Sequence, residues 1–404
     1  MNRLPGSYLL LAVAMALLAS CGKTGDGSVD LPDTTRRAPA DDYPRVDNAI
    51  PSVTVTWDGS ARKISHNVGY AEYGRVVRLN GDTLLLTYHS GPDKANFFGV
   101  DIAVRESVDN GNTWSGATIV VDGPAPGYYG FQNPDILVEK NGWLLLAFVG
   151  RGKPDNNAND NVQVCISRDR GGSWSKPVVA ASGRSWEPGM IQLDDGTIDL
   201  FYSSEAEWFP GTDVQQEILL ISSSDNGQSW TSPRRVAYTP GMRDGMAVPV
   251  LLAGGGGIAF SIESVGNSTS PWIVWSSVAA NFGYADYGTV QNARRWAVTS
   301  GQLFGGAPYL IRLPGGETLI SMQYPGGRAI GGNWKKSTAT VFVGNGMATH
   351  FTNQSFPWPN LPVDEGAYFN SLFMKNDSTP VLITTRNMAD GHSEIWWKEG
   401  HLHG

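Results

Sequence analysis

Polar side chains recur along the chain at the starts of six apolar, strand-like stretches. Two regions supply a glutamate: Glu187 stands at the start of the third stretch, and Glu263 ends the strand that follows the fourth. Two carboxyl groups that face one cavity can break a glycosidic bond, because one protonates the leaving oxygen and the other acts as nucleophile or base. The sequence therefore nominates Glu187 and Glu263 as a catalytic pair.

Other residues at the same positions are suited to holding a sugar. Amide, carboxylate and guanidinium groups bind hydroxyl groups, and flat aromatic rings can stack on sugar rings. A tryptophan in the long loop 205–217 could add a stacking platform. The candidate substrate-binding residues are Arg75, Asn133, Asp135, Trp208, Arg243, Asp244, Tyr309, Tyr368 and Asn370.

Each candidate also has an ordinary structural interpretation. Glu187 precedes a proline and could sit on an exposed rim, and Glu263 could pair with a neighbouring arginine. Arg75 could bind backbone carbonyl groups between sheets, and Trp208 could simply anchor its loop. Three residues fit the lining of a cavity better than catalysis: Tyr309, Tyr368 and Asn370.

A repeated strand-turn-strand pattern explains why these residues should converge. Its six copies, spaced 53 to 64 residues apart, begin at Tyr73, Asn133, Trp186, Asp244, Pro308 and Tyr368. Each copy can form one hairpin of a four-stranded blade, and six blades closed in a ring leave no exposed sheet edge. The sequence predicts an all-β, six-bladed β-propeller of antiparallel blades. The strand Ser52–Trp57 is expected to complete the last blade beside Glu394–Trp397.

A second repeat has the pattern S-x-D-x-G-x-[ST]-W. It occurs at Ser107–Trp114, Ser167–Trp174 and Ser223–Trp230. The aspartate can accept hydrogen bonds from the turn, the glycine permits positive φ, and the tryptophan packs the turn onto its sheet. The motif resembles the Asp-box, or BNR repeat, of sialidase-type propellers, which joins the third and fourth strands of a blade far from the active site. The structural aspartates are then Asp109, Asp169 and Asp225.

Composition narrows the fold class and the kinds of ligand that we expect. The 404 residues include 49 glycines and 24 prolines, which favours short strands over long helices. The net charge is 30 minus 38, or -8, with no basic patch, so nucleic-acid binding is not expected. The six histidines are scattered, so neither a metal site nor a cofactor is expected. We expect a monomer that acts on an oligo- or polysaccharide.

The N-terminus predicts export and a lipid anchor. Residues 1–20 read as a signal peptide, with an apolar run too short to span a membrane. The sequence Leu18-Ala19-Ser20-Cys21 resembles the bacterial lipoprotein box, which implies acylation of Cys21. Residues 21–50 are then a flexible tether, and 51–404 form the catalytic propeller. The expected location is the bacterial cell envelope, at the outer membrane or cell surface, with the periplasm also open; a plain secretory signal is the alternative.

The chain also resembles glycoside hydrolase family 93, the exo-acting arabinanases with six-bladed propellers. The resemblance lies in the order of short motifs: Trp186–Pro188, Phe201–Ser203, Arg243–Met246 leading to Glu263, and Gly366–Phe373. It implies a retaining mechanism on α-1,5-L-arabinan, with Glu187 as nucleophile and Glu263 as acid/base. Where the family tends to read Arg-Pro-Gly-Met this chain has Asp244, which bears on fine specificity.

Two other functions remain open. Sialidases clamp the substrate carboxylate with three arginines and use a tyrosine-glutamate pair as nucleophile. Their Arg-Ile-Pro motif reads Arg75-Val76-Val77 here, and Arg243 is the other arginine at an inner-strand start. A triad would need one of three further arginines: Arg312, Arg328 or Arg386. A non-catalytic glycan-binding surface lipoprotein is the third possibility, because a fold does not fix a function.

Replacing the acylated residue tests the anchor. We expect Cys21→Ser to abolish membrane association without harming folding, since the anchor would lie outside the propeller. Fractionation of cells and a melting curve of the released protein measure both effects. Recovery of the variant in the detergent-soluble membrane fraction would contradict the lipoprotein assignment.

Overall fold

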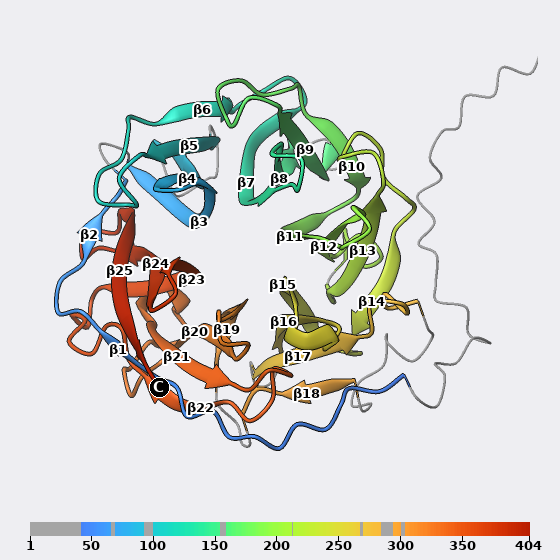
Figure 1. The fold of residues 1–404 in the computed structure, drawn as a ribbon. Coiled ribbons are helices and arrows are strands. Elements are labelled where there is room, and N and C mark those ends of the chain that lie inside the picture. The colour runs from blue at the N-terminus through green and yellow to red at the C-terminus, as the bar shows by residue number, and fades with distance from the viewer. Residues whose placement is uncertain are drawn as a thin grey trace, which may run out of the picture.

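The computed structural model describes residues 42–65, 69–92, 100–153, 159–211, 213–266, 270–283, 294–299 and 304–404. The signal peptide and Cys21 lie outside these ranges. Within them the regular structure consists of β-strands and two short 3-10 turns, η2 (Ala253–Gly255) and η4 (Trp334–Lys336). No helix in the described part of the chain is long and apolar enough to cross a membrane. The strands are arranged as a ring of sheets around a central axis (Figure 1).

Strand pairing gives four separate four-stranded antiparallel sheets and one nine-stranded sheet. The nine-stranded sheet contains two more groups of four antiparallel strands, joined by one parallel pair, Ser393 with Tyr70. These six groups are the blades. The first three blades comprise, from the axis outwards, β3 (Tyr70–Asn80), β4 (Thr83–Gly91), β5 (Asp101–Ser107) and β6 (Thr118–Val121); β7 (Tyr128–Val138), β8 (Leu144–Gly152), β9 (Asn161–Ser167) and β10 (Val178–Ser182); and β11 (Ser185–Gln192), β12 (Ile198–Ser204), β13 (Glu217–Ser223) and β14 (Arg234–Tyr238). The last three comprise β15 (Arg243–Leu251), β16 (Ile258–Val265), β17 (Ser270–Ser276) and β18 (Arg295–Ala297); β19 (Gly306–Arg312), β20 (Thr318–Tyr324), β21 (Thr338–Gly344) and β22 (Thr352–Ser355); and β23 (Gly366–Asn376), β24 (Thr379–Asn387), β25 (Ser393–His403) and β1 (Thr54–Trp57).

The hydrophobic core is distributed between the blades. Six apolar clusters each join two successive blades, including one that joins blade 6 to blade 1. Between blades 3 and 4, for example, the rings of Phe201 and Phe260 lie 5.1 Å apart. Six interfaces for six blades mean that the ring is closed. The predicted all-β propeller is therefore confirmed.

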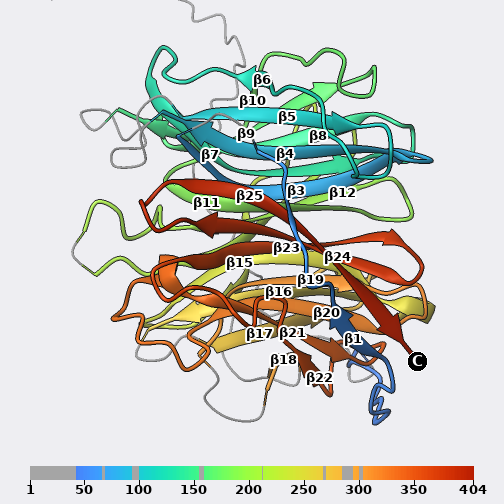
Figure 2. The same cartoon turned by 90° about the vertical axis from the view of Figure 1, so that its left-hand side faces the viewer.

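The N-terminal strand closes the ring, but in a different register from the one expected. β1 pairs with Gly400–His403, while β2 (Arg62–Lys63) lies beside Trp396 and Trp397. β25 continues to His403, so His401 and His403 belong to a paired strand. Figure 2 shows β1 alongside the end of β25. Chain ends far apart in sequence thus share the last blade.

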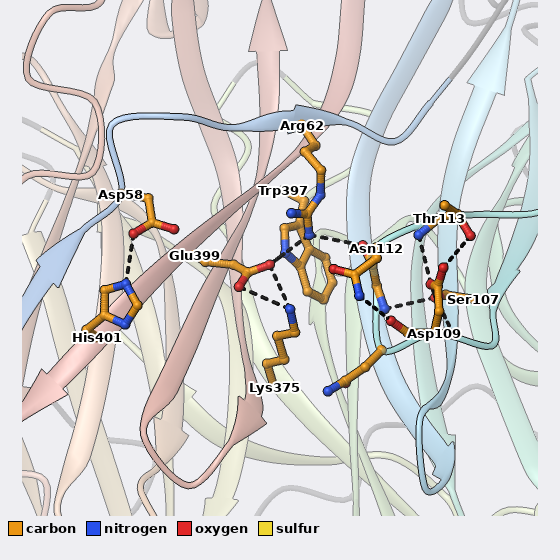
Figure 3. Close-up of polar contacts among 12 residues, drawn as sticks. Asp58, Arg62, Ser107, Asp109, Asn112, Thr113, Lys375, Trp397, Glu399 and His401 are labelled. Atoms are coloured by element: carbon orange, nitrogen blue, oxygen red, sulfur yellow. Dashed lines mark hydrogen bonds and ion pairs between the residues drawn. The ribbon is translucent and has the colours of Figure 1, made fainter.

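Polar contacts fix the junction between blades 6 and 1 (Figure 3). Glu399 accepts hydrogen bonds from Arg62 at 2.7 Å, from Trp397 at 2.9 Å and from Lys375 at 3.0 Å. Arg62 also donates to the carbonyl of Gly111 in the turn of blade 1, at 3.1 Å. The Glu399 carboxylate therefore binds two cations and an indole, which come from three strands, where the last blade meets the first.

The segment before β1 runs along the outside of blades 4 and 5. Arg45 donates to the carbonyl of Gly254 at 2.6 Å, and Asn345 donates to the carbonyl of Asp47 at 2.8 Å. Asn353 holds the chain further on, at Val53, at 2.7 Å. Residues 42–50, expected at the end of the flexible tether, are thus bound to the propeller.

The three Asp-boxes have the predicted turn geometry and join the third and fourth strands of blades 1, 2 and 3. In the first, Asp109 accepts hydrogen bonds from the Thr113 backbone at 2.8 Å, the Thr113 hydroxyl at 2.5 Å and the Ser107 hydroxyl at 2.8 Å. Bonds from Thr113 lower the pKa of Asp109 to about 2. Asp169 and Asp225 repeat the pattern.

The Asp-box glycine contacts the preceding blade. Gly111 has φ +83°, and a Cβ there would lie 2.6 Å from the Trp397 ring. A left-handed backbone and the absence of a side chain are therefore both required. Blade 5 holds a variant of this turn that the motif did not reveal: Asn345 accepts from the Thr349 backbone at 3.0 Å and from its hydroxyl at 2.9 Å.

Removing an Asp-box carboxylate should destabilise the fold and spare the active site. We expect Asp109→Ala, Asp169→Ala and Asp225→Ala each to lower the melting temperature by a few degrees, because the turn loses its hydrogen-bond acceptor. Calorimetry and a turnover assay measure the two effects. Full loss of turnover with an unchanged melting temperature would place these residues at the site instead.

Candidate active site

Every inner strand carries a bulge at the same place. Pairing with the second strand skips two residues, and the first of the two has positive φ. These first residues are Tyr73, Asn133, Glu187, Met246, Ala307 and Phe369. A left-handed backbone is costly for such residues, at about 1 to 3 kcal/mol each, and bulges redirect side chains. The bulges therefore form a ring of redirected side chains around the axis.

Each bulge also frees a backbone N–H group. In five blades this group donates to a side chain on the second strand of the preceding blade; the acceptors are His89, Ser203, Glu263, Gln323 and Thr385. All five acceptors pair with the residue just before their own blade's bulge. A neutral side chain satisfies the bond in four cases. Only Glu263 brings a charge to this position.

Glu187 is the carboxylate of the bulge ring. Its φ is 54°, and its Oε2 atom accepts hydrogen bonds from the Met246 backbone at 3.0 Å and the Ser203 hydroxyl at 3.2 Å. The left-handed backbone conformation at Glu187 thus directs its side chain toward the neighbouring blade. Glu187 lies in the funnel, not on an exposed rim.

Glu263 lies on the next blade and accepts a hydrogen bond from the Ala307 backbone at 2.6 Å. Its strand neighbours Phe260 and Ile262 belong to the apolar cluster with blade 3, whereas Glu263 faces blade 5. Arg243 favours its charged form at longer range, without a direct ion pair between the two.

Both glutamates line one cavity of about 240 Å³. Glycines at the residue before the bulge in blades 4 and 5 leave this space open. A Cβ on Gly245 would lie 3.4 Å from Glu187 Oε2, and one on Gly306 would lie 3.0 Å from Glu263 Oε2. The remaining walls are Val265, Gln323, Trp334, Lys335, Tyr368 and Phe369.

The two carboxyl groups influence each other's protonation. Burial, together with the negative charge of Glu263, raises the pKa of Glu187, and burial raises the pKa of Glu263. Two carboxylates so placed titrate as a unit and tend to hold one proton between them. The cavity can therefore present one acid and one base together, as glycosidic bond cleavage requires.

Tyr368 lines the same cavity and donates a hydrogen bond to Glu72. Burial and the charge of Glu72 raise the pKa of Tyr368 well above its ordinary value, so the phenol stays protonated. Glu72 also lies 3.9 Å from His89, whose other ring nitrogen accepts the freed N–H of Asn133. A polar network thus continues from the cavity into blades 1 and 2.

Three predicted substrate-binding residues lie in a different cavity. They are Arg75, Asp135 and Tyr309, and each is the first paired residue after the bulge of its strand. They line a channel of about 240 Å³, and neither glutamate lines it. Arg75 is buried, 3.8 Å from the ring centre of Tyr73 and 4.9 Å from that of Tyr309. Burial raises the pKa of Asp135 to about 6. This channel shares no lining residue with the cavity that holds Glu187 and Glu263.

Other predicted residues have structural contacts instead. Asp244 is fully buried and bound by Arg295 at 2.9 and 3.1 Å. Trp208 stacks on Tyr238, with ring centres 5.4 Å apart, so it anchors its loop. Asn370 is buried and accepts from Thr384 at 2.9 Å.

Asn133 and Arg243 keep a place near the mouth. Asn133 belongs to the bulge ring, and its Oδ1 atom is buried without a hydrogen-bond partner. Arg243 is half exposed, binds Glu205, and favours the charged forms of Glu187 and Glu263.

Sequence reasoning missed six cavity residues: Val265, Gly306, Gln323, Trp334, Lys335 and Phe369. Two of them had a readable signal. Gln323 and Phe369 occupy the repeat positions of Glu263 and Glu187 in later blades. Trp334 and Lys335 come from η4, in a loop that the repeat does not define, where Trp334 stacks on Phe304 at 4.1 Å.

The fold is an all-β propeller like those of solved sialidases and arabinofuranosidases. Residues 142–302, which include the second and third Asp-boxes, match the BNR repeat-like domain family. A sialidase from Clostridium perfringens is 24% identical over 200 residues, which are 42% of this chain and 51% of the sialidase. The match thus spans about half the length of that relative.

Solved structures show the same architecture. A Dyadobacter fermentans protein of unknown function superposes with a TM-score of 0.69 at 17% identity, covering 88% of this chain and all of that one (100%). The family GH93 α-L-arabinofuranosidase of Fusarium graminearum, solved with arabinobiose, superposes with a TM-score of 0.58 at 17% identity, covering 84% of this chain and 97% of that one.

The raised pKa of Glu187 predicts a stability change with a definite sign. Its folded pKa lies above the ordinary 4.5, so wild-type stability is lost as pH rises through the folded pKa. We expect Glu187→Gln, which keeps an acceptor for Met246, to raise the melting temperature by a few degrees at about pH 9 and by little at about pH 4. Differential scanning calorimetry measures both.

The exposed Glu106 on β5 offers a matched control. Glu106→Gln should leave the melting temperature nearly unchanged at either pH. If Glu187→Gln changes the melting temperature equally at both pH values, or lowers it at high pH, then ionisation of Glu187 does not destabilise the folded protein.

Proposed function

We propose that this protein is an exo-acting, retaining glycoside hydrolase on a plant-type polysaccharide, most simply α-1,5-L-arabinan. The observation that carries the proposal is the pair Glu187 and Glu263 in one cavity, each held by a freed backbone N–H group. The family GH93 resemblance of the motifs and the likeness of the fold to an arabinofuranosidase support the substrate class.

The proposed reaction needs one protonated and one ionised glutamate in the same cavity. One glutamate gives its proton to the leaving glycosidic oxygen while the other, ionised, attacks the anomeric carbon and forms a glycosyl ester. The first then takes a proton from the water that cleaves this ester. We assign Glu187 as the nucleophile and Glu263 as the acid/base, and the small cavity suits a chain end.

Cleaving a sialoside is the second candidate function. Tyr368 bound to Glu72 at the cavity supplies a tyrosine-glutamate pair, and the Clostridium perfringens relative is a sialidase. The positions of the arginines that could form the triad argue against a sialidase. Arg75 lies in the channel, Arg312 and Arg328 bind backbone carbonyls, and Arg386 pairs with Glu365. Among the described arginines, Arg243 is the one that acts on both glutamates.

We further propose that the enzyme works from the cell envelope, tethered through Cys21. An anchored enzyme would act on polysaccharide fragments that reach the cell. This location rests on the lipoprotein box of the sequence alone.

Product release and two alanine variants test the mechanism. Arabinan, sialyllactose and rhamnogalacturonan are incubated with the protein, and products are identified by mass; we expect release from arabinan. Glu187→Ala should slow turnover by several orders of magnitude, about 10³-fold or more, and azide should restore it as an inverted glycosyl azide. Glu263→Ala should spare the first step on substrates with good leaving groups, which need no proton.

The outcomes separate the candidates. Release from sialyllactose alone would favour the sialidase, and sugar binding without any turnover would favour a lectin. Near-wild-type rates in either alanine variant on the natural polysaccharide would remove the two-glutamate mechanism. Glu106→Ala serves as the exposed control and should keep full activity.

A further inference from the structure

A third and larger cavity lies on the rim of the propeller, between blades 5 and 6. We call it the rim groove; it has a volume of about 640 Å³ and shares no residue with the catalytic cavity. Its walls come from β1, the turn after it, the segment 355–362 and β25. Figure 1 shows β1 and β22 at the perimeter of the ring, away from the inner strands that carry the glutamates.

Aromatic rings dominate this groove. Trp57, Trp358 and Trp396 each bond their indole N–H within the protein, to Ser355 at 3.0 Å, to Thr384 at 3.3 Å and to Glu394 at 2.8 Å. Their polar atoms are thus already satisfied, so the indoles offer a ligand mainly apolar ring surface. Phe356, 45% exposed, adds a further open ring. Flat apolar surfaces of this kind suit the faces of sugar rings.

Two cations lie at the floor of the groove. Arg386 and Lys398 stand 4.5 and 4.6 Å from the ring centre of Trp358, and both side chains belong to residues more than nine-tenths buried. Arg386 pairs with Glu365, but its Nε atom has no hydrogen-bond partner. Lys398 forms no ion pair with another described residue. Desolvation lowers its pKa, and the negative charge of Asp58, which also lines the groove, offsets part of this effect.

A ligand carboxylate would compensate this charge. Burying a cation is costly when its charge is only partly compensated, and a carboxylate that reaches it forms a charge-assisted hydrogen bond. The protein as a whole carries a charge of -8, so an anion gains nothing from the overall field and must find a local site. Rings for a sugar face beside a cation for a carboxylate match one ligand class, the uronic acids.

We propose that the rim groove binds uronate residues of an acidic polysaccharide. The sugar ring packs against Phe356 and the exposed indole surface, and the carboxylate pairs with Lys398, with Arg386 beside it. The site holds a polymer at the rim and does no chemistry, so it is independent of the proposed hydrolase activity.

Affinity electrophoresis of the full protein in gels containing polygalacturonate tests the site. We expect wild-type protein to be retarded, and the retardation to fall as salt is raised, because the contact is electrostatic. Lys398→Met keeps the buried aliphatic stem and should weaken binding about tenfold. Phe356→Ala removes an exposed ring and should weaken it about fivefold.

Matched controls decide the interpretation. Lys176→Met changes an exposed lysine on blade 2 and should bind like wild type. Glu187→Gln should also bind like wild type, since the groove lies outside the catalytic cavity. Neutral dextran should not retard the protein.

Several results would overturn the proposal. Equal retardation of wild type and Lys398→Met would remove the lysine from the site, and loss of binding in Glu187→Gln would place the polymer in the catalytic cavity. Retardation by dextran to the same degree would exclude carboxylate recognition. Binding of poly-L-proline without polygalacturonate would make the groove a peptide site, since proline-rich chains also dock on aromatic surfaces.

Discussion

The structure depends on one backbone device, the two-residue bulge near the start of every inner strand. A regular strand would use its N–H groups in the ladder and alternate its side chains between two faces. The bulge breaks both rules, because it turns one side chain toward the axis and frees one N–H group toward the preceding blade. Glu187 is such a side chain, and the N–H groups of Met246 and Ala307 hold Glu187 and Glu263.

Such a device persists only when its surroundings fix it. The first residue of each bulge has a left-handed backbone conformation, although its residue type favours a right-handed one. These six residues would return to the favoured conformation if the blades could move apart. The apolar clusters between successive blades prevent this, and so does the shared last blade, where β1 and β25 join the two ends of the chain. The Asp-box glycine that fits against Trp397 shows how closely neighbouring blades approach. Closure of the ring therefore supports the geometry of the site.

The sequence predicted the repeats and, through them, the fold; it also placed the two glutamates in adjacent blades. It could not predict which residues after the bulge face the cavity. Each bulge sets two residues against one and so adds one residue to the strand, which reverses the expected direction of every later side chain. Arg75, Asp135 and Tyr309 were misplaced for this reason. The signal was nevertheless present: Pro134, Pro188 and Pro308 stand second in three bulges, and proline inside a sheet indicates a bulge. Trp334 and Lys335 could not be found this way, since their loop has no counterpart in the other blades.

The repeated pattern also separates structural from functional side chains. A bulge N–H group needs only an acceptor, and His89, Ser203, Gln323 and Thr385 provide one without a permanent charge. Glu263 meets the same need with a carboxylate that burial disfavours, beside a second carboxylate that burial also disfavours. A charge that the fold does not require, placed where the fold makes it costly, is better explained by chemistry than by stability. The other five blades of the same chain serve as the reference, since none of them carries a carboxylate at this position.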